Sequence, residues 1–301
     1  MTMGRDTFNV GATFQRATYD RFEGLNLGNG DVRFRVDDQP NLGDVTDAQL
    51  SIDLSTDILV LFRSYGLTDR LDVGTVVPII RVDFNASIEP TLVATSAGPL
   101  PFGQRVALPV QSRSGTASGV GDITVRTKYN VVKRQGGGVS LVLDLRMPTG
   151  DAEEMLGSGA GAAKVMFVAS STLERVAPHF NVGYTFVGAG ANNTIAIDDE
   201  YNYVAGVDTV VTNDVSASFD IVARTITNIG RLRLGPAPNQ SGNQTDQLTR
   251  EAGNLNLRAA GFGLKWRVAG TWLVSGRVLV PLSDAGLVDR ATWSLGLDWT
   301  R

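Results

Sequence analysis

The stretch from 121 to 151 reads GDITVRTKYNVVKRQGGGVSLVLDLRMPTGD, two apolar and β-branched runs joined by a glycine-rich turn. In the first run the charged residues Asp122 and Arg126 alternate with the apolar residues Ile123 and Val125, and the second run repeats this period-2 pattern. Charged side chains are rarely buried unless they are paired, and an isolated buried charge is costly. The hairpin therefore requires an interior that accepts charge while the opposite face of each strand stays apolar.

The composition limits the class of protein. A chain of 301 residues is long enough for one large all-β domain, and we expect a single domain over residues 1–301. A net charge of −4 with no run of lysine or arginine gives no support for a nucleic-acid partner. The absence of cysteine excludes disulfides, thiolate metal sites and cysteine nucleophiles. We expect neither a cofactor nor a metal.

Two kinds of targeting segment are missing from the sequence. No window is long and apolar enough for a transmembrane helix. The N-terminus, MTMGRDTFNVG, lacks the basic start, apolar middle and small-residue cleavage site of a signal peptide. The chain is therefore either cytosolic or the mature form of a secreted protein with an added initiator methionine. The strand pattern favours the second.

Alternation of apolar and polar residues recurs along almost the whole chain and predicts about twelve β-strands. In one of them Leu54 and Ile58 face one way, while Asp53 and Asp57 face the other. The segments have roughly 10 residues or a little more, the length of a tilted strand that crosses a bilayer. The expected spans are 6–18, 48–65, 70–85, 120–133, 138–149, 161–173, 178–188, 200–212, 215–228, 254–267, 271–282 and 290–301.

The connections between these segments alternate in length. Short turns such as 134–138 and 212–214 alternate with long connections such as 86–119 and 229–253. An up-and-down barrel in an outer membrane has this rhythm, with short periplasmic turns and long extracellular loops. A water-soluble β-sandwich is the alternative, but it leaves the alternation unexplained. We predict an all-β fold, a transmembrane up-and-down antiparallel barrel of about twelve strands with both termini on the periplasmic side.

This fold accounts for the charges, because the apolar face of each strand meets lipid and the polar face meets a lumen. Closure of the barrel also leaves no sheet edge unpaired in the membrane. Two interpretations stay open: a charged constriction that selects solutes, or a lattice of salt bridges that fills a narrow barrel. The strand phase places these pore-lining residues in the lumen: Asp53, Asp57, Asp122, Arg126, Lys128, Asp144, Arg146, Lys164, Asp208, Asp220, Arg224, Arg258 and Arg277.

Several motifs, taken in order, resemble one family of Gram-negative outer-membrane barrels. They read YGLTDRLDVGTVVPII (65–80), GVGDITVRTKY (119–129), LRMPTGD (145–151), LGSG (156–159) and PHFNVGYTF (178–186). The family is the transporter-like one described as the "putative MetA-pathway of phenol degradation". The resemblance covers roughly residues 60–190. It implies an outer-membrane channel for aromatic or other small, poorly water-soluble compounds, and it brings no catalytic residues.

Three functions follow for such a barrel. The first is a channel through which small, aromatic or hydrophobic solutes diffuse passively past a charged lumen. The second is a sealed barrel that serves a structural or surface-binding role without transport. The third is a barrel hydrolase, which needs a histidine beside a serine. His179 is the only histidine, and no serine lies two residues from it on either side. We therefore expect a structural role for His179 and no enzymatic activity.

The expected partners are the lipid bilayer, lipopolysaccharide and a small-molecule solute, with the protein acting as a monomer in the bacterial outer membrane. Acidic clusters such as Asp151–Glu154 lie in long connections and suggest divalent cations shared with lipopolysaccharide, although solvated loop charge explains them more simply. The mildly apolar connection 86–119 is predicted to fold near the mouth of the barrel. The polar connection 229–253 is predicted to be a mobile loop.

Overall fold

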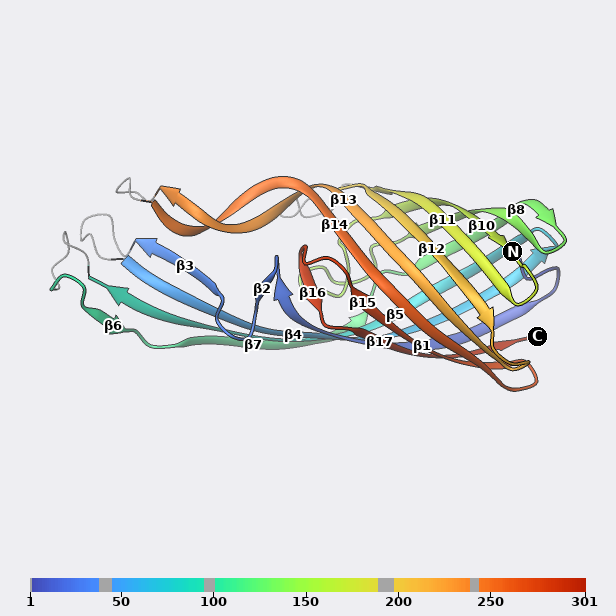
Figure 1. The fold of residues 1–301 in the computed structure, drawn as a ribbon, viewed down its shortest axis with the longest axis horizontal. Coiled ribbons are helices and arrows are strands. Elements are labelled where there is room, and N and C mark those ends of the chain that lie inside the picture. Colours follow the sequence, from blue (N-terminus) through green and yellow to red (C-terminus); the bar gives the residue numbers. More distant parts are fainter. Residues whose placement is uncertain (1, 38–44, 95–100, 189–197, 239–243) are drawn as a thin grey trace.

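A computed structural model describes residues 2–37, 45–94, 101–188, 198–238 and 244–301. The described residues form one closed, antiparallel β-barrel (Figure 1). Four short strands accompany its wall: β2 (Leu25–Asn26), β3 (Val32–Asp37), β6 (Arg105–Ala107) and β16 (Leu287–Asp289). The wall consists of β1 (Phe8–Phe22), β4 (Val45–Thr68), β5 (Leu71–Val93), β7 (Gln111–Val120) with β8 (Thr124–Arg134), β9 (Gly137–Arg146), β10 (Ala162–Ser171), β11 (Val176–Val187), β12 (Glu200–Val210), β13 (Val215–Pro238), β14 (Gln244–Ala269), β15 (Trp272–Pro281) and β17 (Thr292–Thr300).

β7 and β8 both pair with β5, one after the other along its length, and so count as one strand of the wall. The described wall therefore has twelve strands, which confirms the predicted fold class. The last strand, β17, pairs with β1 and closes the barrel. The turns at one end are short, with 69–70 and 211–214 as examples, and both termini lie at that end (Figure 1). No helix among the described residues is long and apolar enough to cross a bilayer.

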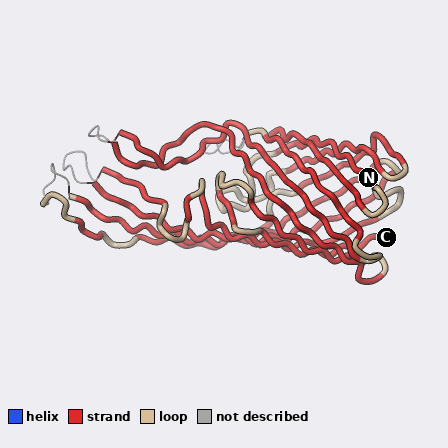
Figure 2. Tube along the Cα trace, in the orientation of Figure 1, coloured by secondary structure: helices blue, strands red, loops and turns tan. Residues whose placement is uncertain are grey.

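Four strands are about twice as long as the rest. β4 and β14 have 24 and 26 residues, and their neighbours β5 and β13 have 23 and 24. Most others have 9 to 12 residues, close to the ~10 that cross a membrane. About 13 residues of β4 therefore extend beyond the bilayer, roughly 40 Å of strand. Figure 2 shows these extensions as two arms on the extracellular side, and β3 of one arm lies near β14 of the other.

The sequence prediction was wrong where it took long connections for loops. The segment 86–119 contains the end of β5, all of β6 and most of β7, with 95–100 outside the described residues. The segment 229–253 contains the outer halves of β13 and β14, with 239–243 outside the described residues. The error came from reading the segments beyond each membrane-crossing strand as loops, whereas these strands continue into the extracellular space.

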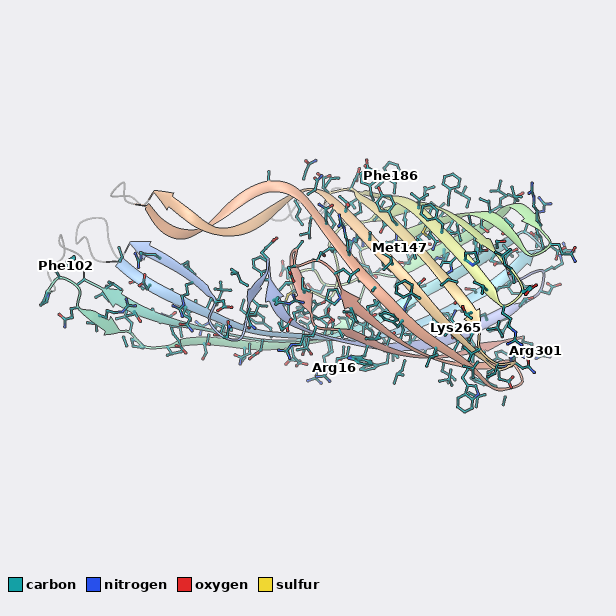
Figure 3. The ribbon with its side chains drawn as sticks, in the orientation of Figure 1. Arg16, Phe102, Met147, Phe186, Lys265 and Arg301 are labelled. Atoms are coloured by element: carbon teal, nitrogen blue, oxygen red, sulfur yellow. The ribbon has the colours of Figure 1, made fainter. Side chains whose placement is uncertain are left out.

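The part of the wall next to the short turns has an apolar outer face and a polar inner face. Outward side chains such as Leu145, Phe167 and Leu295 are 46%, 54% and 67% exposed, as lipid-facing groups are. Inward carboxylates such as Asp144 and Asp220 are only 7% and 4% exposed. Figure 3 shows a dense fringe of side chains around the outside of this part of the barrel. The alternation predicted from the sequence is therefore that of the membrane-spanning wall.

Polarity reverses on β4 and β5 without any shift in their pairing. Leu59 pairs with Ile79 on the outer face, and the next outward pair along the strands is Asp57 with Arg81. From this level outward the outer face is polar, while Leu54 and its neighbours on the same phase face inward. The register between the two strands is continuous over this boundary. The outer edge of the lipid-facing band therefore lies between these two pairs.

A break in the wall lies at the same level. β7 pairs with β5 along one edge, and no strand among the described residues pairs with its other edge. The pairing with β9 begins only at Thr124, in β8. An unpaired strand edge is not tolerated in the hydrocarbon of a bilayer. Since Val120 pairs with Ile79 at the end of the lipid-facing band, the open edge begins where the hydrocarbon ends.

We predict that Leu143→Arg, on the outer face of β9, lowers the free energy of unfolding by about 2–4 kcal/mol, because it places a charge near the bilayer midplane. Ser118→Arg, on the outer face of β7 beyond the apolar band, serves as the control and should change it by less than about 1 kcal/mol. Urea unfolding of the barrel in lipid vesicles, followed by heat-modifiable gel mobility, measures both. Equal losses in the two variants would contradict the boundary given above.

Candidate functional site: the lumen of the barrel

A charged cluster covers the inner face of β8, β9 and β10. Arg126 donates two hydrogen bonds of 2.7 Å to the carboxylate of Asp144, from Nε to Oδ1 and from Nη2 to Oδ2. Lys164 is the register partner of Asp144 on the other side. Three strands thus place a planar guanidinium, a carboxylate and an ammonium group side by side. Such a bidentate pair fixes both geometry and charge.

A second cluster continues around the wall on β11, β12 and β13. Arg224 donates hydrogen bonds from Nε and Nη2 to the two oxygens of Glu200, the first at 2.9 Å. Beside it the Asn202 amide donates to Thr185 Oγ1 at 3.0 Å. Glu200 and Thr185 are each 4% exposed, so these groups form a closed polar layer on the wall. Buried polar groups that are fully hydrogen-bonded make a wall rigid.

The third cluster surrounds the single histidine. His179 Nε2 lies 2.8 Å from Asp220 Oδ1, and its Nδ1 lies 3.5 Å from Asp208 Oδ2. Arg277 pairs with the other oxygen of Asp220. Gly206 lies beneath this group, and a Cβ there would stand 2.7 Å from His179 Nε2 and 2.2 Å from Asp220 Oδ1. The close approach of the histidine and the aspartate to the wall therefore requires glycine.

The junction between β7 and β8 is held by Asp122. Its carboxylate accepts hydrogen bonds from the backbone N–H of Gly150 at 3.1 Å and from the N–H and Oγ of Ser158 at 2.8 and 2.6 Å. Arg146 Nε lies 3.9 Å away. These contacts hold the segment 147–161 against the inside of the wall. The interior end of this segment is Leu156, 4% exposed and close to Gly119.

Carboxylates and guanidinium groups differ in burial on this inner face. The side chains of Asp144, Glu200 and Asp220 are 9%, 5% and 6% exposed. Their partners Arg126 and Arg224 are 48% and 41% exposed, and Arg277 is similar. The carboxylates therefore lie against the wall and the guanidinium groups lie nearer the centre of the lumen. The charged half of the lumen therefore exposes mainly guanidinium donors on its inner surface.

The opposite half of the lumen, on β4 and β5, is apolar. Leu54, Ile58 and Val60 face inward from β4, and their register partners on β5 are Phe84, Ile80 and Pro78. Further inward-facing residues continue this surface along the extracellular arm: Leu50, Ile52, Val82, Ala86 and Ile88. Interiors of membrane barrels are generally polar, so an apolar wall of this length is a specific feature.

The N-terminal segment lies across the periplasmic end of the lumen. The backbone N–H of Met3 donates to Asp72 Oδ2 at 3.0 Å, and the amide of Asn130 donates to Thr2 Oγ1 at 2.6 Å. Asn130 is 0% exposed and Ser140 is 2% exposed. The Ser140 hydroxyl donates to the side-chain oxygen Oδ1 of Asn130 at 2.5 Å. These contacts narrow the periplasmic mouth.

The structure places most of the predicted pore-lining residues on the inner face of the wall. They are Asp122, Arg126, Lys128, Asp144, Arg146, Lys164, Asp208, Asp220, Arg224 and Arg277. Asp53, Asp57 and Arg258 are corrections. The first two lie on the outer face of β4 beyond the lipid-facing band, and Arg258 pairs with outward Ala223 near the extracellular end of the wall. These residues do alternate with apolar ones, but in the strand segments beyond the membrane the polar side chains face outward and the apolar side chains face inward.

Sequence reasoning missed two inner groups. Glu200 lies in the predicted strand 200–212 but was not among the predicted pore-lining residues; it begins β12 and pairs with Arg224. Asp72 lies near the start of β5, inside the predicted strand 70–85, but it too was not among the predicted pore-lining residues. The signal for Glu200 was available, since it has the same phase as Asn202 and Asp208. In the described part of the chain, no three histidine or carboxylate side chains come together as a metal site would need.

Comparisons with known proteins agree with this architecture. The sequence profile of the family described as "Putative MetA-pathway of phenol degradation" matches residues 33–286. A comparison with curated proteins finds no sequence match. The chain is similar in structure to the COG4313 outer membrane channel from Pseudomonas putida F1, with a TM-score of 0.60, 14% identity, and coverage of 100% of this chain and 97% of that one.

Two further solved structures are more distant. A Pseudomonas aeruginosa FadL homologue has a TM-score of 0.43 and 10% identity, covering 98% of this chain and 89% of its own. The Ralstonia pickettii toluene transporter TbuX has a TM-score of 0.31 and 11% identity, covering 99% and 90%. The first structure establishes the outer-membrane barrel fold, and identities this low establish the fold alone.

We predict that Asp144→Ala lowers the free energy of unfolding by roughly 1–3 kcal/mol, because it leaves Arg126 and Lys164 without their shared carboxylate. It should also shift the reversal potential in planar bilayers toward anion preference, since two cations lose their counter-charge. The double variant Arg126→Ala/Asp144→Ala is the control and should recover part of the stability. A reversal potential identical in wild type and Asp144→Ala would place this pair outside the conducting path.

Proposed function

The chain belongs to the family described as "Putative MetA-pathway of phenol degradation", and from that membership and the lumen we propose that it is an outer-membrane channel for small amphipathic organic molecules. Such a molecule has an apolar body and one polar or anionic end. Transport is passive diffusion down a concentration gradient. The similar architecture of the outer membrane channel from Pseudomonas putida F1 supports the channel class.

The observation that carries this proposal is the apolar inner wall of β4 and β5. It extends from Leu50 in the extracellular arm to Val60 inside the membrane-spanning part, and Thr56, opposite Val82, is the one polar residue of β4 in this phase. Burial of apolar surface gains about 25 cal/mol per Å², so an apolar solute gains free energy at each step along this wall. A hydrophilic solute gains nothing from it. The arm thus collects apolar molecules outside the membrane and delivers them to the lumen.

The charged inner face supplies the second half of the selectivity. Arg126, Arg224 and Arg277 each keep a partly exposed guanidinium group while their carboxylate partners are buried. Guanidinium groups bind carboxylates through paired hydrogen bonds and also stack on aromatic faces. A small aromatic acid or a phenol suits both halves of the lumen at once. A cationic solute does not.

Catalysis is disfavoured by the surroundings of His179. Ser170 is its register partner across β10 and β11, which brings together a serine, a histidine and an aspartate. A catalytic base needs one ring nitrogen free to face the serine. Here Nε2 faces Asp220 and Nδ1 faces Asp208. We therefore propose that His179 is a link in the charge lattice and not a general base.

A sealed barrel is the second candidate function, and the covered periplasmic mouth favours it. Asn130 and Ser140 are almost completely buried beneath the N-terminal segment. Single-channel recording of the purified barrel in planar bilayers separates the two functions. Steady open currents support the channel, and silence supports the sealed barrel. Because β17 pairs with β1 within one chain, the barrel also closes without a partner, which supports a monomer.

We predict that Leu54→Asn/Ile58→Asn slows uptake of an amphipathic probe through the barrel by roughly tenfold, because it removes apolar contact worth about 1.4 kcal/mol or more. The measurement is entry of radiolabelled benzoate into proteoliposomes at pH 8, relative to entry of glycerol through the same barrels. Ser55→Asn, on the outer face between the two sites, is the matched control.

The ratio of benzoate to glycerol entry should fall in the double variant and stay at the wild-type value in Ser55→Asn. An unchanged ratio in the double variant would contradict an apolar path along β4. Equal loss of benzoate and glycerol entry would indicate a blocked lumen instead of a lost affinity.

A further inference from the structure

The outer face of the extracellular arm carries a polar hollow directly above the lipid-facing band. Four adjacent strands, β1, β4, β5 and β7, contribute to it in consecutive register rows. The hollow is a shallow depression open to solvent, with a volume of about 350 Å³, at the low end of the roughly 300–1,000 Å³ typical of small-ligand sites. Its polar lining consists of Arg16, Thr18, Asp53, Ser55, Asp83, Asn85, Ser114 and Thr116, and Leu54, Phe84 and Gly115 complete it. We call these residues the outer hollow.

The row just below the hollow is apolar on every one of these strands. Phe14, Leu59, Ile79 and Val120 are register partners, and each is between 37% and 47% exposed. On the far side of β1, Leu295 pairs with Phe14 and is 67% exposed. A single molecule placed here meets an apolar surface over its lower part and a polar hollow over its upper part. That division is the chemistry of a lipid with its headgroup.

The polar groups of the hollow are ordered among themselves. Arg81, which lies between the apolar row and the hollow, donates to both oxygens of Asp83 at 3.0 and 3.2 Å. Thr116 Oγ1 donates to the same carboxylate at 2.7 Å. These bonds hold the pKa of the Asp83 carboxyl below its ordinary value, so the group is ionised at neutral pH. Arg81 is thereby fixed with its remaining donors exposed.

The second arginine is held loosely. Arg16 Nε lies 3.7 Å from Asp57, and its side chain is 60% exposed and projects from the outer wall (Figure 3). An exposed pair of this kind contributes little to stability, so the guanidinium is available to a ligand. Two arginines therefore border the hollow at the level where lipid headgroups begin. Guanidinium groups bind phosphate with paired hydrogen bonds.

The remaining lining selects a saccharide over a simple headgroup. Hydroxyl groups of Thr18, Ser55 and Ser114, with the amide of Asn85, offer donors and acceptors of the kind that bind sugar hydroxyls. A phospholipid headgroup uses the arginines but leaves these hydroxyls unused. The outer leaflet that faces the extracellular arm contains a lipid with acyl chains, phosphates and sugars in that order. We propose that the outer hollow binds the phosphorylated saccharide head of one lipopolysaccharide molecule, whose acyl chains cover the apolar row.

The site is separate from the charged lumen, because its polar side chains have the opposite phase to the apolar inner wall, of which only Leu54 and Phe84 border the hollow. It therefore does not rest on the proposed solute. It also gives the outward position of Asp57 and Arg81 a role, because an alternating charge row at the headgroup level accepts both phosphates and the divalent cations that accompany them. The barrel would be fixed at one height and one orientation in the membrane by this contact.

The test is binding of a fluorescent rough lipopolysaccharide, comprising lipid A and a phosphorylated inner core, to the detergent-solubilised barrel. We expect Arg16→Gln/Arg81→Gln to weaken binding at least tenfold. Arg63→Gln is the matched control, because Arg63 lies on the outer face of β4 near the periplasmic rim and should leave binding unchanged. Heat-modifiable gel mobility confirms that each variant is folded. Ser114→Trp, which fills the hollow and leaves both arginines in place, should also weaken binding at least tenfold.

The competitors identify the headgroup. Unlabelled rough lipopolysaccharide should displace the probe at least tenfold more effectively than either its dephosphorylated form or phosphatidylglycerol. Equal displacement by phosphatidylglycerol would show a general phosphate site and overturn the saccharide assignment. Wild-type affinity in both Arg16→Gln/Arg81→Gln and Ser114→Trp, or an equal loss in Arg63→Gln, would overturn the site itself.

Discussion

The rest of the structure depends on the requirement that every backbone N–H and C=O inside the hydrocarbon be hydrogen-bonded. The pairing of β17 with β1 meets this requirement by removing the last open edge. The requirement ends where the hydrocarbon ends, and there the wall changes. β7 leaves one edge unpaired from Val120 outward, and the strands divide into two arms (Figure 1). The limit of the hydrogen-bonded cylinder and the limit of the apolar outer face are therefore the same boundary.

That boundary explains the reversal of polarity on β4. The alternation of side chains along a strand has a fixed period of two, and no bulge shifts it between Val45 and Gly66. Inside the bilayer the outward phase must be apolar, as Leu59 and Leu61 are. In the extracellular space the outward phase meets water, and Asp57 and Asp53 occupy it. The inward phase from Leu50 to Val60 is apolar except at Thr56, so the arm and the lumen share one largely apolar surface.

Sequence reasoning predicted the cylinder because its rules are periodic and local. The hairpin of residues 121–151 has the predicted faces, with Arg126 and Asp144 inside and Val125 and Leu143 outside. The same rules failed at Asp53 and Asp57, because alternation alone does not say which face meets lipid. The ion-pair partners were also beyond prediction. Arg277 and Asp220 are 57 residues apart, and their contact depends on the stagger of β13, β14 and β15 around the barrel. Loop lengths and composition contain no information on that stagger.

The sequence left open whether the inward charges face water or form ion pairs with one another. The burial of the partners indicates that they do both. Asp220 accepts bonds from Arg277 and His179 and is almost fully buried, so its charge is satisfied within the wall. Arg277 pairs with Asp220 through one part of its guanidinium group, and the other part of that group stays exposed. A guanidinium has five donors in a fixed plane, whereas a carboxylate against the wall needs only two or three. A lattice built from arginine and carboxylate therefore fills the wall with anions and leaves surplus donors facing the lumen. In the proposed channel, these surplus donors would bind the electron-rich end of a solute, and the apolar half of β4 and β5 would hold the rest of the molecule.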